Sequence, residues 1–451
     1  MPDKEKIAEV LAAAKKDRVG FIDLQFTDFF GRIKSSTIPV YKLEDALKNG
    51  IWFDGSSIEG FARIHESDML LKPDPETYAL LPWRNDAEKN RVARLICDVY
   101  KPNHEPFEGD PRFILKKVIK EAKNLGFDYF VAPECEFFLF PKDADKNILR
   151  RSKGVGHYYD LIMDDTYAIK REIIETLDKI GIRTETMTHE VADNQHEIDF
   201  HYDQALKTAD NTVTLKMATK FIAGKHDYHA TYMPKPLTGI SGNGMHIHQS
   251  LWQTPGNLNA FYKKEDKYGL SATAYQFLAG QLKFAREIIG ILAPTVNSYK
   301  RLTPGYEAPV NICWARINRS ALIRIPQVPK EKCEQATRLE IRCADPSGNP
   351  YLSFAVLLKA GLAGIKRKLT PPEPVEENLY KFDDQKLAER YITNLPANLE
   401  EALREMKSGI IVKETFGEEI LKRYLEIKRE EWDSFRTAVT DWEVDHYLTT
   451  V

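Results

Sequence analysis

Two acidic residues lie one residue apart in PECEFFLF, residues 133–140, directly before an apolar and aromatic run. The composition of this run predicts a largely buried strand that Pro133 opens near a sheet edge. On such a strand Glu134 and Glu136 project from the same face, roughly 6–7 Å apart. Two ionised carboxylates at that spacing repel each other by about 2–3 kcal/mol at an effective dielectric constant of about 20. The pair therefore requires a positive neighbour, either arginines on a solvated face or a hard metal ion.

Four further segments repeat this pattern of polar side chains on one strand face. GNGMHIHQS (242–250) carries two histidines two residues apart, and RLEIR (338–342) alternates charged with apolar residues. HEVADNQHEIDF (189–200) and residues 300–326 add glutamates and arginines. The polar residues concerned are Glu190, Glu197, His246, His248, Arg301, Glu307, Arg319, Arg324, Arg338, Glu340 and Arg342. Five polar-faced segments on a solvated surface would leave only their opposite faces to build the core, so the set favours a functional site.

The residue types indicate the chemistry of that site. Glutamates with one histidine suit Mg²⁺ or Mn²⁺ better than zinc, which usually takes more imidazole or thiolate. Hard cations beside arginines are what phosphoryl transfer requires, because both neutralise charge on the phosphate oxygens. Neither GxxxxGK[ST] nor GxGxxG after a strand is present, so a P-loop or Rossmann architecture is unsupported. Spacing alone therefore predicts a metal-dependent enzyme of nucleotide or phosphate chemistry, with its substrate open.

Taken singly, several of these residues have simpler interpretations. Arg324 also fits a charge at a strand edge, and His248 fits a hydrogen-bonded core histidine. His196 and His201 are expected to be structural.

Composition limits the possible partners. The 451 residues carry a formal charge of −3, which offers no general attraction to nucleic acid or to an anionic membrane. The five cysteines form no CxxC pair, as expected of free thiols in a reducing compartment. The first twenty residues lack the apolar stretch of a signal peptide, and no segment reaches membrane-spanning length. We therefore expect a cytoplasmic protein.

The elements that position the site fall into two regions. An N-terminal helix pattern is followed by short strands, a loop over FDGSSIEGFARIHESDM and further strands at YALLPW and RVARLICDVY, ending near Pro102. A helix then begins at Pro111 and ends at Gly126. Strands and helices alternate to about residue 370, and the remainder is helical, with residues 418–448 as its longest stretch.

Seven segments, in order along the chain, resemble the signature blocks of type I glutamine synthetases. They are FDGSSIEGF (53–61), PECEFFLF (133–140), HEVADNQHEIDF (189–200), GNGMHIHQS (242–250), NSYKRLTPGYEAPVN (297–311), NRSALIRIP (318–326) and RLEIRCADPSGNPYL (338–352). The resemblance implies an α+β fold, with a small β-grasp-like domain, residues 1–103, and a large α/β catalytic domain with an antiparallel sheet, residues 104–451. It also implies a homo-dodecamer of two hexameric rings, with each active site between neighbouring subunits.

The activity that this resemblance implies is the ATP-dependent ligation of ammonium to L-glutamate through γ-glutamyl phosphate. Glu136, Glu190 and Glu197 match ligands of a metal ion on the glutamate side, and Glu134, His246 and Glu340 match ligands of one bound with the ATP phosphates. Two or more Mg²⁺ or Mn²⁺ ions per site are therefore expected. The two acids of PECEFFLF would each serve a different cation.

The remaining site residues follow from the same resemblance. The glutamate-binding set is Gly242, Arg301, Glu307 and Arg342; the nucleotide set is Glu185, His248, Ser250 and Arg338; the phosphate contacts are Arg319 and Arg324. Glu307 belongs to a flap that keeps water from the acyl phosphate. Asp54 and Ser57 match an ammonium site supplied by the neighbouring subunit, where Asp54 takes the proton, and Asp68 anchors that loop.

Several positions depart from the family pattern. Ser241 replaces an asparagine associated with the glutamate amino group, and Asn243 is the candidate to compensate. Gln335 replaces a nucleotide-side lysine of some members. Tyr380 lies near a tyrosine that some members adenylylate, but the following residues differ and no adenylylation is expected. Arg63, in contrast, matches an arginine of the subclass in which glutamine inhibits the enzyme by feedback.

Two other functions remain open at this point. A relative could join glutamate to a larger amine, which should require a reshaped corner at Asp54 and Ser57. An inert scaffold would be expected to lose metal ligands or Glu307. The sequence leaves open control by 2-oxoglutarate or by a nitrogen-regulatory protein.

Overall fold

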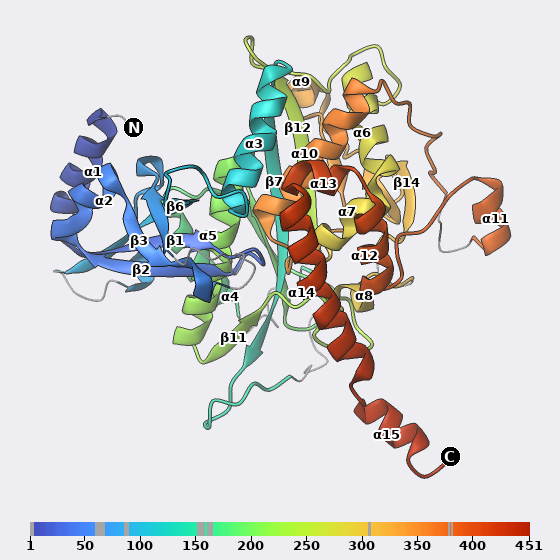
Figure 1. The fold of residues 1–451 in the computed structure, drawn as a ribbon. Coiled ribbons are helices and arrows are strands. Elements are labelled where there is room, and N and C mark those ends of the chain that lie inside the picture. Colours follow the sequence, from blue (N-terminus) through green and yellow to red (C-terminus); the bar gives the residue numbers. More distant parts are fainter. Residues whose placement is uncertain are drawn as a thin grey trace.

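The computed structural model describes residues 4–58, 68–84, 90–150, 158–159, 166–304, 308–377, 379 and 382–451. Two sheets organise the chain, a small one formed by the N-terminal region and a large one at the centre of the molecule (Figure 1). The predicted α+β class is confirmed.

The N-terminal sheet has six strands in the order β2-β1-β6-β4-β3, with β5 paired to β6. The pair β1–β6 is parallel and the other pairs are antiparallel. Its elements are α1 (Lys4–Lys16), β1 (Val19–Thr27), β2 (Ile33–Pro39), α2 (Leu43–Asn49), β3 (Ile51–Asp54), β4 (Asp68–Pro73), β5 (Ala79–Leu80) and β6 (Arg91–Tyr100). Apolar side chains of both helices and of the sheet form one separate core.

Two N-terminal segments differ from the sequence-based expectation. The predicted loop is shorter, because Asp54 ends β3 and Asp68 begins β4, where the two residues are antiparallel partners. The predicted strand YALLPW is reduced to β5, since the chain turns into a 3₁₀ helix at Pro82–Arg84. Pro82 has no N–H to continue a strand ladder.

The central sheet has ten strands in the order β14-β15-β16-β12-β7-β9-β8, with β10 and β11 also paired to β7 and β13 to β12. It is antiparallel except for the pair β14–β15 at one end. The strands are β7 (Phe127–Pro141), β8 (Thr184–His189), β9 (Gln195–Phe200), β10 (Asp203–Gln204), β11 (Tyr228–Thr231), β12 (Met245–Gln253), β13 (Leu258–Asn259), β14 (Asn311–Ala315), β15 (Ala321–Arg324) and β16 (Leu339–Ile341).

Pro133 does not open a strand near an edge, as the sequence had suggested, but lies within β7, between β12 and β9. On the β9 side the ladder is broken at this point, because β10 pairs with Phe130 and Val131 whereas β9 pairs from Glu134 onward. A proline fits this gap, since no strand there requires its missing N–H.

Helices pack on the central sheet and supply most of the main core. The helices that follow the N-terminal sheet are α3 (Pro111–Asn124), α4 (Tyr167–Asp178), α5 (Ala205–Lys225), α6 (Ala272–Lys283), α7 (Ala285–Leu292), α8 (Ser298–Arg301), α9 (Cys333–Ala336), α10 (Pro350–Lys366), α11 (Asp384–Glu389), α12 (Leu399–Ser408), α13 (Ile411–Phe416), α14 (Glu418–Thr437) and α15 (Asp441–Tyr447). The predicted start of α3 is confirmed, with Pro111 in its first turn and Asp110 accepting a hydrogen bond from the Arg112 N–H.

The C-terminal helical stretch is interrupted. Helix α14 ends at Thr437, and α15 begins at Asp441. Thr440 caps the start of α15 and forms a reciprocal capping box with Glu443. The second helix extends away from the body of the molecule, at the lower right of Figure 1. Its side chains Trp442, Val444 and Leu448 are exposed.

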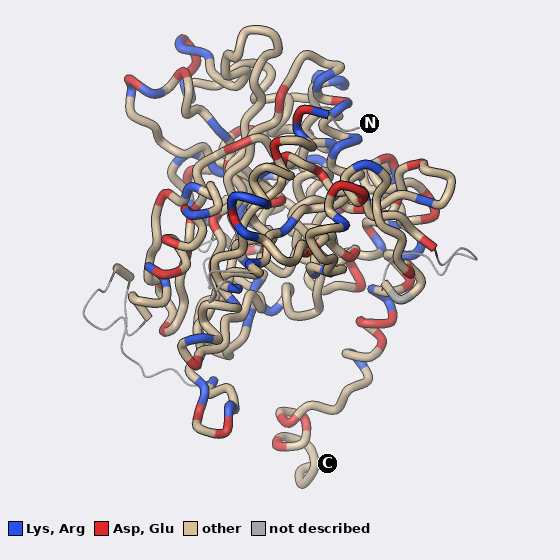
Figure 2. The backbone as a smooth tube through the Cα atoms, turned by 90° about the vertical axis from the view of Figure 1, so that its left-hand side faces the viewer, with Lys and Arg blue, Asp and Glu red and all other residues tan. Residues whose placement is uncertain are grey.

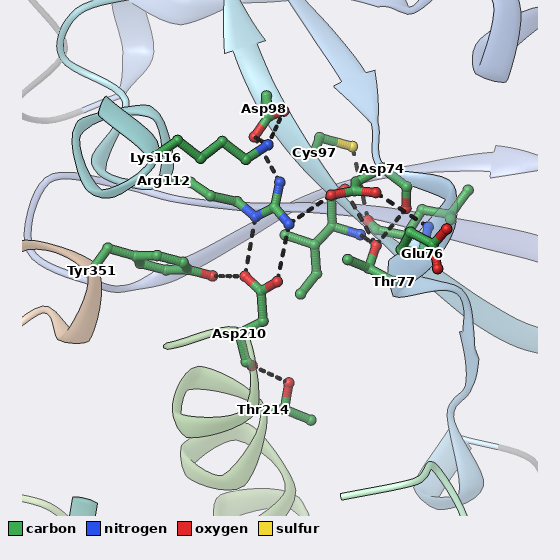
Figure 3. A network of polar contacts seen from close by, with 12 residues as sticks. Asp74, Glu76, Thr77, Cys97, Asp98, Arg112, Lys116, Asp210, Thr214 and Tyr351 are labelled. Carbon is green, nitrogen blue, oxygen red and sulfur yellow. Dashed lines mark hydrogen bonds and ion pairs between the residues drawn. The ribbon is translucent and has the colours of Figure 1, made fainter. Parts of the chain in front are cut away.

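A buried ionic junction joins the two regions. Arg112 on α3 donates to Asp74 (2.8 Å) and Asp98 (2.7 Å) of the N-terminal region and to both carboxylate oxygens of Asp210 on α5 (3.0 and 3.1 Å), as Figure 3 shows. Tyr351 on α10 donates to Asp210 at 2.6 Å. One guanidinium therefore links elements of both regions around a single charge.

Elsewhere charge is evenly spread. Basic and acidic residues are interspersed over the coloured part of the chain in Figure 2, in keeping with the formal charge of −3. Within the described residues, no helix is both long and apolar enough to cross a membrane.

We predict that Arg112→Met destabilises the protein by about 3–5 kcal/mol, because it leaves buried carboxylates without their partner. Urea unfolding followed by tryptophan fluorescence measures this loss. The exposed pair Lys48–Glu44 provides the control, since Lys48→Ala should cost no more than about 0.5 kcal/mol. Equal effects of the two substitutions would contradict a structural role for the junction.

Candidate active site

The central strands bring most of the predicted site residues onto one face of the sheet. Antiparallel pairing places residues of β12, β7, β9, β15 and β16 directly opposite one another. The cross-strand partners are His246–Glu134, Glu197–Glu136, His248–Glu340 and Arg324–Glu340. The alternation that the sequence predicted on each strand therefore becomes one continuous polar surface.

Two cavities open over this surface. The first, which we call the aromatic cavity, measures about 410 Å³ and includes Phe130, Phe200 and Tyr202 in its wall. It also contains the whole predicted nucleotide set and Gln335: Glu185, His248, Ser250, Gln335 and Arg338. Its wall thus combines apolar rings with many polar and charged side chains, which suits a small molecule that is itself partly polar.

The second cavity, which we call the acidic cavity, measures about 340 Å³. Its wall contains the following predicted residues: Glu134, Glu136, Glu190, Glu197, Ser241, Gly242, His246, Arg301, Arg319, Arg324, Glu340 and Arg342. Glu134 and Asp199 line both cavities, so the two spaces meet at these carboxylates.

Glu134 lies between two histidines. Its Oε2 is 2.8 Å from Nδ1 of His246, and its Oε1 is 2.6 Å from Nε2 of His248. Burial alone would raise the pKa of Glu134, but His248 and His246 hold it well below its usual value. Glu134 is thus ionised at neutral pH.

The proton on His248 can be assigned from its neighbours. Nε of Arg338, which can only donate, lies 3.2 Å from Nδ1 of His248. Nδ1 therefore accepts, and Nε2 carries the proton that faces Glu134. In this state His248 offers no lone pair to a metal ion at Nε2, although it lies close enough to Glu134 and Glu340 to form a ligand group.

Glu340 is held by arginines. Nη1 of Arg324 donates to its Oε2 at 2.8 Å, and Nη1 of Arg342 donates to its Oε1. Burial would raise the pKa of Glu340, but Arg342 and the two histidines lower it. The arginines therefore lie beside a fixed anion, with further donor groups left for an anionic substrate.

Three further acids of the acidic cavity have raised pKa values. Burial, together with neighbouring carboxylates, raises the pKa of Glu190 to about 8, of Asp199 to about 7 and of Glu197 to about 11. Ligand atoms of Glu134, Glu197 and His246 lie within 4.8 Å of one another. Crowded carboxylates with raised pKa values and a nearby imidazole fit a hard divalent cation, which would relieve their repulsion.

Arg301 is positioned by main-chain carbonyls. It donates to Cys343 O and Ala344 O at 3.1 Å and to Arg342 O at 3.2 Å. A Cβ at Gly244 would lie 2.6 Å from Nη2 of Arg301, so only glycine leaves space for this guanidinium.

Some predicted residues lie elsewhere or outside the described residues. Asp54 and the backbone of Ser57 lie in the N-terminal sheet region, and Asp54 is absent from the described walls of both cavities. Glu307, Arg63 and Tyr380 lie outside the residues that the structure describes.

The expected compensation by Asn243 is wrong. Its side chain is fully buried and donates to Met233 O at 2.9 Å. It holds the backbone of this loop and does not reach the cavity, whereas Ser241 does line it. The asparagine of the family pattern therefore has no substitute at position 243.

Sequence reasoning missed parts of the cavity walls. Asp199 follows Glu197 by two residues and therefore shares its strand face, which was a usable signal. Tyr202 and Phe130 approach to 6.0 Å between ring centroids only through the β7–β10 pairing. His201, expected to be structural, stacks on Tyr202 in the aromatic cavity, whereas His196 is buried against Thr166 as expected.

A cavity of about 860 Å³, larger than the aromatic and the acidic cavity, lies between the N-terminal sheet, α5 and α14. None of the predicted site residues lines it. Size alone would therefore have identified a different place from the one that the side-chain chemistry indicates.

Comparison with known proteins agrees with this architecture. Residues 18–102 match the family model "Glutamine synthetase, beta-Grasp domain", and residues 108–447 match "Glutamine synthetase, catalytic domain". Curated glutamine synthetases of Methanocaldococcus jannaschii (48% identity) and Clostridium saccharobutylicum (47%) each align over 98% of both chains. The solved structures of a GmaS–ADP complex and of apo GmaS superpose with TM-scores of 0.87 and 0.86, at 31% and 30% identity. The first alignment covers 97% of this chain and 99% of the other, and the second covers both completely.

A β-grasp domain ahead of a catalytic domain defines this protein as a two-domain ligase. The chain belongs to the glutamine synthetase family. Enzymes of this family depend on ATP and use divalent metal ions. The resemblance seen in the sequence and the fold that it implied are both confirmed.

We predict that the metal-free protein becomes less stable as pH rises from about 5 to about 8. Glu190 and Asp199 have folded-state pKa values of about 8 and about 7, well above those of an unfolded chain. The folded state therefore binds more protons in this window, and its stability falls as they are released. Urea midpoints measured in EDTA test this slope. Addition of Mn²⁺ and the substitution Glu190→Gln should each reduce the dependence of stability on pH. A stability that rises with pH in EDTA would contradict the raised pKa values of Glu190 and Asp199.

Proposed function

We propose that this chain joins ammonium to L-glutamate with the consumption of ATP, giving L-glutamine, ADP and phosphate. The observation that carries this proposal is the meeting of an aromatic and an acidic cavity at Glu134 and Asp199, with arginines beside them. ATP would occupy the first cavity and glutamate the second, so that the γ-phosphate lies at their junction. Family membership identifies this pair of substrates.

The reaction follows two balanced steps. The γ-carboxylate of glutamate takes the γ-phosphoryl group as its bond to ADP breaks, forming γ-glutamyl phosphate. Ammonia then attacks the acyl carbon, the bond to phosphate breaks, and glutamine and phosphate leave. Arg319 and Arg324 are suited to hold the oxygens of the group in transfer.

Two or more Mg²⁺ or Mn²⁺ ions would be held by Glu136, Glu190 and Glu197 and by Glu134, His246 and Glu340. When bound, they would supply charge neutralisation of the phosphate oxygens. Arg301, Arg342 and the Gly242 backbone would bind glutamate, and Glu307 would shield the intermediate from water. These roles agree with the placement of the described residues in the acidic cavity.

The ammonium site is proposed to come from a neighbouring subunit. Asp54 lies in the N-terminal sheet and lines neither the aromatic nor the acidic cavity of its own chain. This position is expected if Asp54 serves the active site of a neighbouring subunit. The exposed apolar residues of α15 also suit a contact with another subunit. Both features support a homo-dodecamer of two hexameric rings, built from domains 1–103 and 104–451.

Location and control belong to the same proposal. Five free cysteines, four of them buried, suit a reducing cytoplasm. Feedback inhibition by glutamine, in which Arg63 takes part, is the expected form of control, and 2-oxoglutarate and a nitrogen-regulatory protein are the further candidate effectors.

The defining experiment incubates the purified protein with glutamate, ATP and Mg²⁺, with ammonium or a series of larger amines, and identifies the product by mass. Glutamine from ammonium supports the proposal. A different γ-glutamyl amide would favour the alternative, a ligase for a larger amine, and no product with any amine would refute both.

We predict that Asp54→Ala chiefly impairs ammonium use, lowering kcat/KM for ammonium by about 10²–10⁴ if this carboxylate takes the proton. KM for ATP should stay unchanged, because the nucleotide cavity is separate. Asp45→Ala provides a matched control, because Asp45 is an exposed aspartate of the same region that accepts a hydrogen bond from Asn49. An unaltered ammonium dependence in the Asp54 variant would remove this residue from the mechanism.

A further inference from the structure

A buried glutamine lies at the back of the acidic cavity, among the proposed metal ligands. Gln195 is the first residue of β9, is only 2% exposed and belongs to the cavity wall. Its side-chain Nε2 donates to Oε2 of Glu136 at 2.8 Å and to Gly242 O at 3.1 Å. A weaker contact, 3.4 Å, reaches Oδ1 of Asn243. One amide group thus touches a proposed metal ligand and the proposed glutamate-binding loop.

The backbone of the same residue contacts a second acid. Gln195 O accepts a hydrogen bond from the Glu190 N–H at 2.8 Å, and Gln195 N donates to Ala192 O at 3.0 Å. These bonds close the turn that carries Glu190 into β9. Glu197 lies two residues further on the same strand face, opposite Glu136. Gln195 therefore contacts the carboxylate of Glu136 and the backbone of Glu190, and it shares a strand face with Glu197.

The orientation of Glu136 depends on these contacts. Its Oε2 also accepts from the Gly244 N–H at 2.8 Å, so two donors hold one oxygen. Two fixed donors on Oε2 set the rotamer of the carboxylate and the direction of Oε1. On the other side of the loop, the side-chain amide of Asn243 donates a hydrogen bond to Met233 O.

The chemistry of the position requires a neutral donor. A lysine or arginine here would compete with a cation for the charge of the three glutamates, and another carboxylate would add to their repulsion. An apolar side chain would leave Glu136 Oε2 and Gly242 O with fewer donors in a buried place. A glutamine amide donates to both oxygens without adding charge.

We propose that Gln195 is a positioning residue that orders Glu136, Glu190 and Glu197 for a divalent cation and couples this arrangement to the glutamate-binding loop at Gly242. The inference rests on the proposed function of the three glutamates as metal ligands. Residues that orient metal ligands typically contribute about 10–100-fold to metal affinity. Gln195 itself contacts neither substrate nor metal.

The test measures Mn²⁺ binding to the full-length protein by isothermal titration calorimetry without nucleotide. In Gln195→Met the amide donor is lost at similar side-chain size, and the Kd for Mn²⁺ should rise by about 10–100-fold. KM for glutamate should rise as well, because Gly242 loses the same donor, whereas KM for ATP should stay near that of the unchanged protein.

Gln249 provides a matched control within the same sheet. It is 1% exposed, accepts from Tyr129 at 2.8 Å and donates to Gln281 at 2.9 Å, away from the three glutamates. Gln249→Met should lower Tm yet leave the Kd for Mn²⁺ unchanged. If both variants weaken Mn²⁺ binding equally, Gln195 acts only through general stability and the proposal is refuted.

Two further variants separate this inference from the proposed function. Glu136→Gln removes a proposed ligand; if it leaves Mn²⁺ binding intact, the assignment of the metal site fails first. If Glu136→Gln weakens binding and Gln195→Met does not, only the positioning role is refuted. Should Gln195→Met not fold, Gln195→Asn keeps polarity but shortens the reach, and an unchanged Kd in that variant overturns the proposal equally.

Discussion

The mutual repulsion of carboxylates on one face of the central sheet is the constraint on which the rest of this structure depends. Glu134, Glu136, Glu190, Glu197 and Asp199 surround one cavity, and burial together with neighbouring carboxylates raises the pKa values of Glu190, Glu197 and Asp199. The two histidines beside Glu134, by contrast, hold the pKa of this carboxyl group well below its usual value. A site of this kind is stable only if hydrogen bonds and a bound cation share the charge.

The scaffold supplies that support from several elements. Antiparallel strands fix the spacing of the acids, and arginines from β15 and the end of β16 hold Glu340. Glycine at position 244 leaves room for Arg301, whose guanidinium is held by carbonyl groups of the loop after β16. Behind the sheet, a helical layer that includes the almost wholly buried α10 makes these positions rigid. The Arg112 junction extends the same rigidity to the N-terminal sheet, which carries Asp54.

Much of this arrangement could be predicted from the sequence. The strand faces at Glu134, His246 and Glu340 follow from alternation, and α3 follows from its proline and its cap. The sequence did not show that β7 passes through Pro133, because the break between β9 and β10 that tolerates it is a tertiary feature. It also suggested Asn243 as a cavity residue, although its buried hydrogen bond to Met233 O turns it away.

The sequence by itself determined which residue types are available, on which strand faces they project and which family the chain resembles. These properties are local or ordered along the chain, so spacing and motif order suffice to find them. Only the tertiary structure decided which acids share a cation-sized space, that the two cavities meet at Glu134 and Asp199, and that Gln195 contacts Glu136 and Glu190. Those facts depend on strand register and on contacts between residues far apart in sequence, which no single segment encodes.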